Sequence, residues 1–250
     1  MQMYRLSRAT VQRHVSYWLD HPPSETIFST TATSAIFDGS VIKHRRGPYV
    51  AMDAKTHTVI AAVDNIAEGG KELLAFYQRL ADAGLLLEYA TIDGNTQQNK
   101  YLRKVWTEII IQRCLVHVQR QGLSWCRRIP KRTDAKHLRK LFLELSHVKT
   151  HSHVQEYLHR VDLWEQRFGA AIHATPEHGY VFSDLKRARS MLLKALPNLF
   201  HCIGNPDIAS STNALEGYFS RLKEQYRRHR GLSRNHRKNF FLWYFYLVRK

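Results

Sequence analysis

Three acidic residues have the types and positions that could hold divalent cations. Asp38 and Asp93 each follow a short apolar segment, and Glu216 lies in the first turn of a predicted helix. Two cations held about 3.5–4 Å apart by carboxylates stabilise both the attacking and the leaving oxygen of an in-line displacement at phosphorus. If folding brings the three acids together, they predict a metal-dependent phosphoryl-transfer site.

Asp38 and Asp93 also have structural explanations, which the sequence leaves open. If residues 34–42 alternate as a strand, Asp38 shares a face with Ser34, Ile36 and Ser40, but an Asp-Gly pair is also common in turns. Asp93 would end a strand, where parallel-sheet proteins place ligands. It could instead cap a helix predicted at 97–106, although Asn95 suits that role better.

Glu216 has the stronger structural alternative. Asn213 as the helix N-cap, with Glu216 three residues later, would approximate a capping box. Against this, Lys223 and Arg227 follow on nearly the same helix face, where a polyanion could run. As an ordered set in a basic chain, the three acids favour the metal site over three separate structural roles.

The spacing of apolar residues predicts a mixed α/β layer around these acids. Alternating segments predict strands, and segments with a period of 3.6 residues predict helices. The predicted strands are 34–42, 49–52, 58–63, 88–93 and 109–111, with helices around 73–80 and 97–106. The resulting order, β-β-β-α-β-α-β, is that of an RNase H-like α/β core.

The region 121–204 changes to helical periodicity throughout, with three apolar stripes on successive predicted helices. We therefore expect an all-helical insertion between Asp93 and Glu216. The domain prediction is a partial helix-turn-helix-like segment at 1–20, an RNase H-like core formed by 33–120 and 205–250, and the helical insertion at 121–204.

Residues 6–18 predict a short helix near the start of the chain. Its polar side chains could enter a nucleic-acid groove, as the second helix of a helix-turn-helix does. An ordinary basic amphipathic helix explains the same residues equally well.

The charge balance predicts a polyanionic partner. The chain carries 38 Lys and Arg against 21 Asp and Glu, a formal net charge of +17. Nucleic acid is the usual partner of so basic a protein, and a merely solvated or ribosome-type surface is the alternative. The 3 cysteines indicate a reducing cytosol rather than a disulfide framework. The longest apolar run, 240–248, is shorter than the roughly 20 residues that span a membrane.

Basic residues concentrate near the end of the chain. They follow Glu216 on the same predicted helix, which would extend over 213–230 and turn them away from its apolar face. A surface of this kind is typical of phosphate binding. The predicted DNA-binding residues are Arg221, Lys223, Arg227, Arg228 and Arg230.

Cys114 and His117 have the Cys-x2-His spacing of half a zinc site. Cys126, His201 and Cys202 are candidates for the other half, without diagnostic spacing. We favour the alternative, a buried cysteine and a hydrogen-bonded histidine that anchor the entry to the helical insertion.

Four short motifs contain the candidate residues: Phe37-Asp38-Gly39, Thr91-Ile92-Asp93-Gly94-Asn95, Arg113-Cys114-Leu115-Val116-His117 and Thr212-Asn213-Ala214-Leu215-Glu216. Together they resemble a known family, the mutator-type (MULE-like) DDE transposases of prokaryotic insertion sequences. The resemblance covers roughly residues 33–250, and Thr-Asn-x-x-Glu with Arg-Cys-x-x-His is its most specific part.

The resemblance implies that Asp38, Asp93 and Glu216 form the catalytic triad on an RNase H-like core and bind two Mg²⁺ (or Mn²⁺). It implies an enzyme that cleaves and joins DNA strands, acting on transposon ends and target DNA as a homodimer or larger assembly. The Cys-His pair recurs in the family. The family pattern also implies a fuller DNA-binding module before residue 6 than this sequence has.

The sequence thus predicts a cytoplasmic DNA transposase, associated with the nucleoid when it acts and with no membrane segment. Two alternatives remain. One is an RNase H-like nuclease that cleaves without strand transfer, and the other is a catalytically inactive DNA-binding remnant of a transposase.

Overall fold

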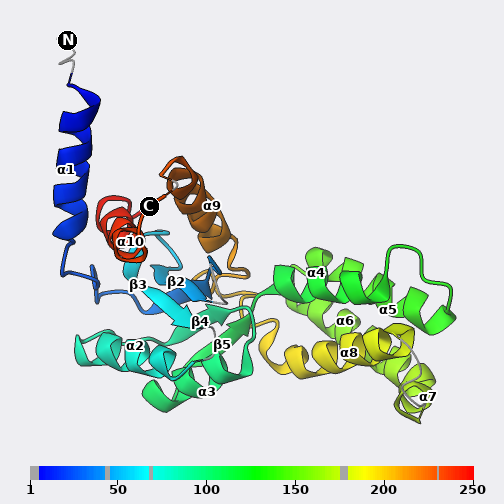
Figure 1. Ribbon diagram of the computed structural model, residues 1–250. Helices are drawn as coiled ribbons and strands as arrows, with labels where there is room; N and C mark the ends of the chain where they lie inside the picture. The colour runs from blue at the N-terminus through cyan, green and yellow to red at the C-terminus, as the bar shows by residue number, and fades with distance from the viewer. Residues whose placement is uncertain (1–5, 43–45, 68–69, 175–179, 230) are drawn as a thin grey trace.

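A five-stranded mixed sheet lies at the centre of the computed structural model, which describes all residues except 1–5, 43–45, 68–69, 175–179 and 230 (Figure 1). The strand order is β3-β2-β1-β4-β5. The first three strands are antiparallel to one another, whereas β4 and β5 run parallel to β1. The strands are β1 (Ser34–Gly39), β2 (Arg46–Asp53), β3 (Val59–Ala67), β4 (Tyr89–Ile92) and β5 (Ile110–Arg113).

Two helices, α2 (Lys71–Asp82) and α3 (Thr96–Val105), cover one face of the sheet (Figure 1). The apolar side chains of the sheet that point to this face, among them Phe37 and Tyr49, pack against them in one buried cluster. Asn95 caps α3 by accepting hydrogen bonds from two backbone N–H groups in its first turn. Burial of this apolar surface supplies the main stabilisation of the layer.

The opposite face is covered by α9 (Asn213–Arg228) and α10 (Arg234–Leu247). Ile36 of β1 belongs to the cluster beneath them, together with apolar side chains of both helices. Tyr218 fixes the end of the chain to α9, because its hydroxyl donates to the Val248 carbonyl at 2.7 Å. Each face of the sheet therefore has its own core.

A helical unit extends from the side of the sheet (Figure 1). It has a third core of its own, separate from those on the sheet. Gly122 allows two of its helices to approach closely, because a Cβ there would overlap the Phe142 ring. Its helices are α4 (Leu115–Cys126), α5 (Thr133–Glu144), α6 (His151–Trp164), α7 (Ala170–Ala174) and α8 (Tyr180–Ala195), with short 3-10 turns at Leu145–His147 and Leu196–Asn198 and a π-helical turn at Glu165–Gly169.

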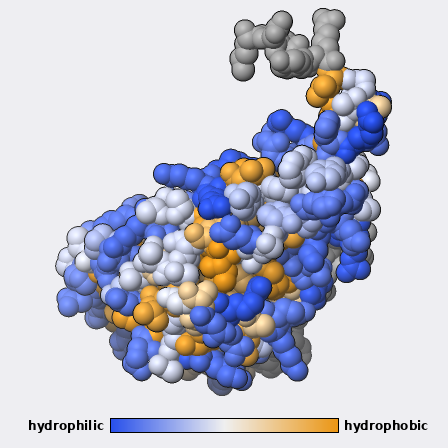
Figure 2. Space-filling view, turned by 90° about the vertical axis from the view of Figure 1, so that its left-hand side faces the viewer, coloured by the Kyte–Doolittle hydropathy of each residue, from blue (hydrophilic) through white to orange (hydrophobic). Residues whose placement is uncertain are grey.

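The first helix, α1 (Arg8–Asp20), projects from the rest of the molecule (Figures 1 and 2). Its last turn contacts α10: Trp18 and Trp243 meet edge to face at 5.4 Å between ring centroids, and Trp243 donates to the Trp18 carbonyl. Within the described residues it is a single helix, and residues 1–5 of the predicted 1–20 segment lie outside them.

The predicted mixed α/β class and the element order β-β-β-α-β-α-β are confirmed. The strand and helix bounds differ from the predictions by a few residues at their ends. Three helices were not predicted: α4, α7 and α10. Of these, α4 begins at Leu115, before the expected insertion boundary at 121, and its side chains already pack in the helical core. Among the described residues, every helix is too short or too polar to cross a lipid bilayer.

Candidate functional site

The pairing of β1 with β4 aligns Asp38 and Asp93. In this parallel pair Ile36 lies opposite Thr91; Asp38 stands two residues further along β1, and Asp93 is the residue that follows the end of β4. Asp93 therefore leaves β4 at the same end of the sheet, and by the alternation of side chains along a strand Asp38 shares the face of Ile36. That face is the one covered by α9 and α10, because Ile36 packs against them and Thr91 donates to the Ala209 carbonyl.

Neither aspartate serves the structural role that the sequence left open. Asp38 lies within β1, opposite Val50, and only 8% of it is exposed, so it is not part of a turn. One of its carboxylate oxygens accepts a hydrogen bond from the Gly39 N–H. The Asp93 carboxylate accepts from the Asn95 N–H, and it is Asn95 that caps α3.

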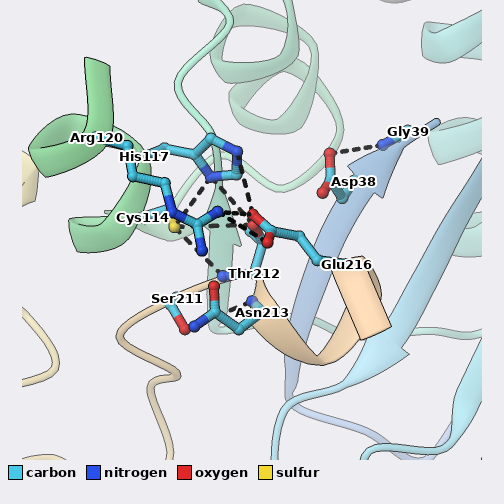
Figure 3. A network of polar contacts seen from close by, with 9 residues as sticks. All are labelled: Asp38, Gly39, Cys114, His117, Arg120, Ser211, Thr212, Asn213 and Glu216. Carbon is cyan, nitrogen blue, oxygen red and sulfur yellow. Dashed lines mark hydrogen bonds and ion pairs between the residues drawn. The ribbon is translucent and has the colours of Figure 1, made fainter. Parts of the chain in front are cut away.

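Glu216 does not form the capping box. The N-cap of α9 is Thr212 rather than Asn213, and its side chain makes no capping hydrogen bond. The Glu216 carboxylate turns instead toward α4 (Figure 3), where Nη1 of Arg120 donates to both of its oxygens at 2.9 Å. Nε2 of His117 lies 3.6 Å from the same carboxylate. Glu216 is therefore oriented by the helical unit.

Cys114 and His117 form the centre of a small polar network (Figure 3). Nδ1 of His117 lies 3.2 Å from the Cys114 sulfur and 3.3 Å from the Thr212 hydroxyl. The Thr212 N–H also points at the sulfur, at 3.4 Å. The network joins the start of α4 to the start of α9, which supports the predicted anchoring role of the pair.

The network favours a protonated His117 next to a cysteine of lowered pKa. The hydrogen bond with Cys114 raises the pKa of His117 to about 9, against the opposing effect of burial. Burial works to raise the pKa of Cys114, but hydrogen bonds from His117 and Thr212 outweigh it and lower that pKa. At neutral pH His117 is thus a cation with both ring nitrogens acting as donors.

His117 lies within the electrostatic influence of all three acids. Glu216 contacts its ring directly, and the charges of Asp38 and Asp93 act on the pKa of His117 in the same direction as Cys114 does. In the part of the chain that the structure describes, no three acidic, histidine or cysteine side chains are arranged to bind a metal.

Arg113 packs against the backbone that follows Asp93. Its Nη1 donates to the Gly94 carbonyl at 2.7 Å, and a Cβ at position 94 would overlap the guanidinium. Gly94 also has a φ of +101°, which L side chains rarely adopt. Gly94 is therefore needed for the close approach of Arg113 to the backbone beside Asp93.

The basic residues predicted to bind DNA extend beyond the acids along α9. Arg221, Arg227 and Arg228 are exposed and Lys223 is half-buried, while Arg230 lies outside the described residues. Arg228 forms an ion pair with Glu224 at 2.6 Å. At 1.5 Å per residue, the last turn of α9 lies roughly 17 Å along the helix from Glu216.

Comparisons with known proteins identify no family. No protein-family model matches this sequence, and no curated protein matches it.

Sequence reasoning did not find Arg120 as a site residue. A signal for it was present: Arg120 follows His117 by three residues, a spacing that places both side chains on one face of a helix. Because α4 was not predicted, that spacing was not recognised as helical.

We expect Gly94→Ala to destabilise the protein more than Gly84→Ala does. Both glycines have positive φ, but a Cβ at Gly84 meets no atom within 4 Å. The control variant should lower the free energy of unfolding by about 1 kcal/mol, and Gly94→Ala by about 1–3 kcal/mol more, since it also disrupts the Arg113 hydrogen bond. Chemical denaturation measures both, and equal losses would show that the Arg113 contact contributes nothing.

We expect Cys114 and His117 to anchor the helical unit without tightly bound zinc. Each already has a partner in the other and in Thr212. Elemental analysis of the purified protein checks this prediction. One equivalent of zinc per chain, absent from Cys114→Ser, would establish the zinc site instead.

Proposed function

We propose that this protein is a DNA transposase that cleaves and joins DNA strands at a site formed by Asp38, Asp93 and Glu216. The observation that supports this most strongly is the position of Asp38 and Asp93 at the same end of two neighbouring parallel strands, on the side of the sheet where α9 carries Glu216. The order of the elements is consistent with an RNase H-like core, and the helical unit occupies the place expected for the insertion.

The donor set fits Mg²⁺ or Mn²⁺. Carboxylate oxygens are the ligands that hard divalent cations prefer. Asp38 and Asp93 lie at the end of β1 and just after β4, and Glu216 lies in the first turn of α9, which covers that side of the sheet. When bound by Asp38, Asp93 and Glu216, two such ions would stabilise the charge on the attacking and leaving oxygens at phosphorus. The Glu216 carboxylate would have to share its contact with Arg120 for this to occur.

The cations of α4 have a second use at such a site. Arg120 is 60% exposed at its side chain, and Nε2 of His117 faces the Glu216 carboxylate at 3.6 Å. Both can donate hydrogen bonds to the oxygens of a DNA phosphate and hold it beside the acids. We propose that they position the scissile phosphate, while α9 binds the phosphates further along the DNA.

The proposal includes the partners and the compartment that the sequence predicted. DNA, both transposon end and target, would be bound by a homodimer or larger assembly in the cytoplasm, at the nucleoid. The net charge of +17 supports a nucleic-acid partner.

A DNA-binding remnant without catalysis is the second candidate, and the Arg120–Glu216 contact favours it. In a remnant this ion pair would hold Glu216 permanently away from a metal. A nuclease that does not join strands is the third. Metal-dependent cleavage excludes the remnant, and joined products exclude the nuclease.

Neutralising any one of the three acids should abolish Mg²⁺-dependent cleavage and leave DNA binding intact. Asp38→Asn, Asp93→Asn and Glu216→Gln should each lower the cleavage rate by a factor on the order of 10²–10³ or more, the range seen when one charge-stabilising group is removed. The measurement is cleavage of labelled DNA carrying the element's ends.

Asp82→Asn is the control for these variants. Asp82 is exposed at the end of α2, on the other face of the sheet, so its replacement changes the net charge equally and should leave cleavage unchanged. Near wild-type cleavage by any one of the three variants would remove that residue from the site.

Replacing Arg227 and Arg228 by Ala should weaken binding to all DNA sequences. Each phosphate that the protein no longer neutralises reduces the magnitude of the slope of log K against log[salt] by about 0.9, so the slope should flatten by roughly one to two units. Sequence preference should not change, because phosphates carry no base identity. Unchanged affinity and slope in a salt titration would mean that these arginines are a solvated helix face.

A further inference from the structure

A strongly basic groove lies between the helical unit and the sheet with its covering helices, which we call the sheet unit. It has a volume of about 740 Å³ and is lined by residues of α3 on one side and of α8 on the other. Five cationic side chains contribute to its wall: Lys100, Arg113, Lys186, Arg187 and Lys194. Among the described residues that line it, none is acidic.

The lysines of this groove are available to a ligand. Lys100 and Lys194 are exposed and Lys186 is half-buried, and no described carboxylate lies within ion-pair distance of any of them. Arg187 has only a distant contact with Asp184, at 3.9 Å. Uncompensated cations gathered on two facing walls repel one another, so an anion between them stabilises the arrangement.

The groove continues into a cavity beside Asp93 and the start of α4. A second cavity of about 410 Å³ contains Asp93, His117 and Arg120, and it shares Gly94 and Arg113 with the groove. Arg113 stands at the boundary, with its Nε buried and without a hydrogen-bond partner. A ligand that filled both spaces would be held by cations along its length and would end beside the Asp93 carboxylate.

We propose that this groove binds the sugar-phosphate backbone of DNA and leads one strand to the acids. A repeated anion could contact the cations on α3, on β5 and along two turns of α8 at once, and a nucleic-acid backbone is such an anion. Binding there also fixes the helical unit against the sheet, because the two walls belong to different units. This inference rests on the proposed function of the acid site. It adds a contact between α8 and the DNA backbone to the contacts already proposed for α9.

The test compares Lys186→Ala/Lys194→Ala with a matched double variant, Lys136→Ala/Lys149→Ala. The control removes the same charge from exposed positions of the helical unit that do not line the groove. Binding of a 30-base-pair duplex (an assumed probe of about three helical turns) is measured by fluorescence anisotropy at several salt concentrations in EDTA. Circular dichroism checks that each variant is folded.

We expect Lys186→Ala/Lys194→Ala to reduce the magnitude of the slope of log K against log[salt] by about one to two units relative to the control, since each phosphate contact contributes about 0.9 to that slope. Lys100→Ala, on the opposite wall, should flatten it by about one unit, which a binding surface confined to α8 would not produce. Groove variants that bind with the affinity and slope of the control would overturn the proposal.

These measurements need no metal and no cleavage, so they are independent of the proposed function. If the wild-type protein binds through the groove but does not cleave DNA, the catalytic proposal fails and the groove stands. If cleavage depends on Asp38 but the groove variants bind normally, the catalytic proposal stands and the groove fails.

Discussion

The parallel hydrogen bonding between β1 and β4 is the constraint on which the candidate site depends. It places Asp38 and Asp93 at the same end of neighbouring strands, and the alternation of side chains along β1 then directs Asp38 to the face of Ile36. A shift of one residue in this register would move Asp93 relative to Asp38 and turn Ile92 out of the apolar cluster under α2 and α3. The burial of Ile36 and Ile92 on opposite faces opposes such a shift, so the same residues that stabilise the sheet also hold the acids in position.

The third acid is held differently, through contacts between the sheet unit and the helical unit. Cys114 lies where β5 ends and α4 begins, and Thr212 lies where α9 begins, so their contact with His117 joins three elements. Gln112 adds a second connection, because its buried amide binds the chain as it returns from the helical unit, at Leu199 and Cys202. The position of Glu216 relative to the aspartates therefore depends on polar contacts as well as on apolar packing.

The sequence predicted the features that arise from local periodicity. The order of strands and helices followed from apolar spacing, and the positions of the two aspartates at strand ends followed from that order. The polar contacts of Glu216 did not follow, because Arg120 and Glu216 are 96 residues apart in the chain. The N-cap of α9 also differed: Thr212, not Asn213, occupies it, since the Thr212 side chain is buried against Cys114 and His117.

The order of the elements along the chain has a consequence for biosynthesis. The sheet and its α2 and α3 cover are complete by residue 113, but the helices that cover the other face are made only after the whole helical unit. Until then the apolar side chains of Ile36, Val50 and Met52 lack their cover on a nascent chain, a state prone to aggregation. Glu216 emerges with that late cover, so a growing chain acquires its third carboxylate only when it can also close its core.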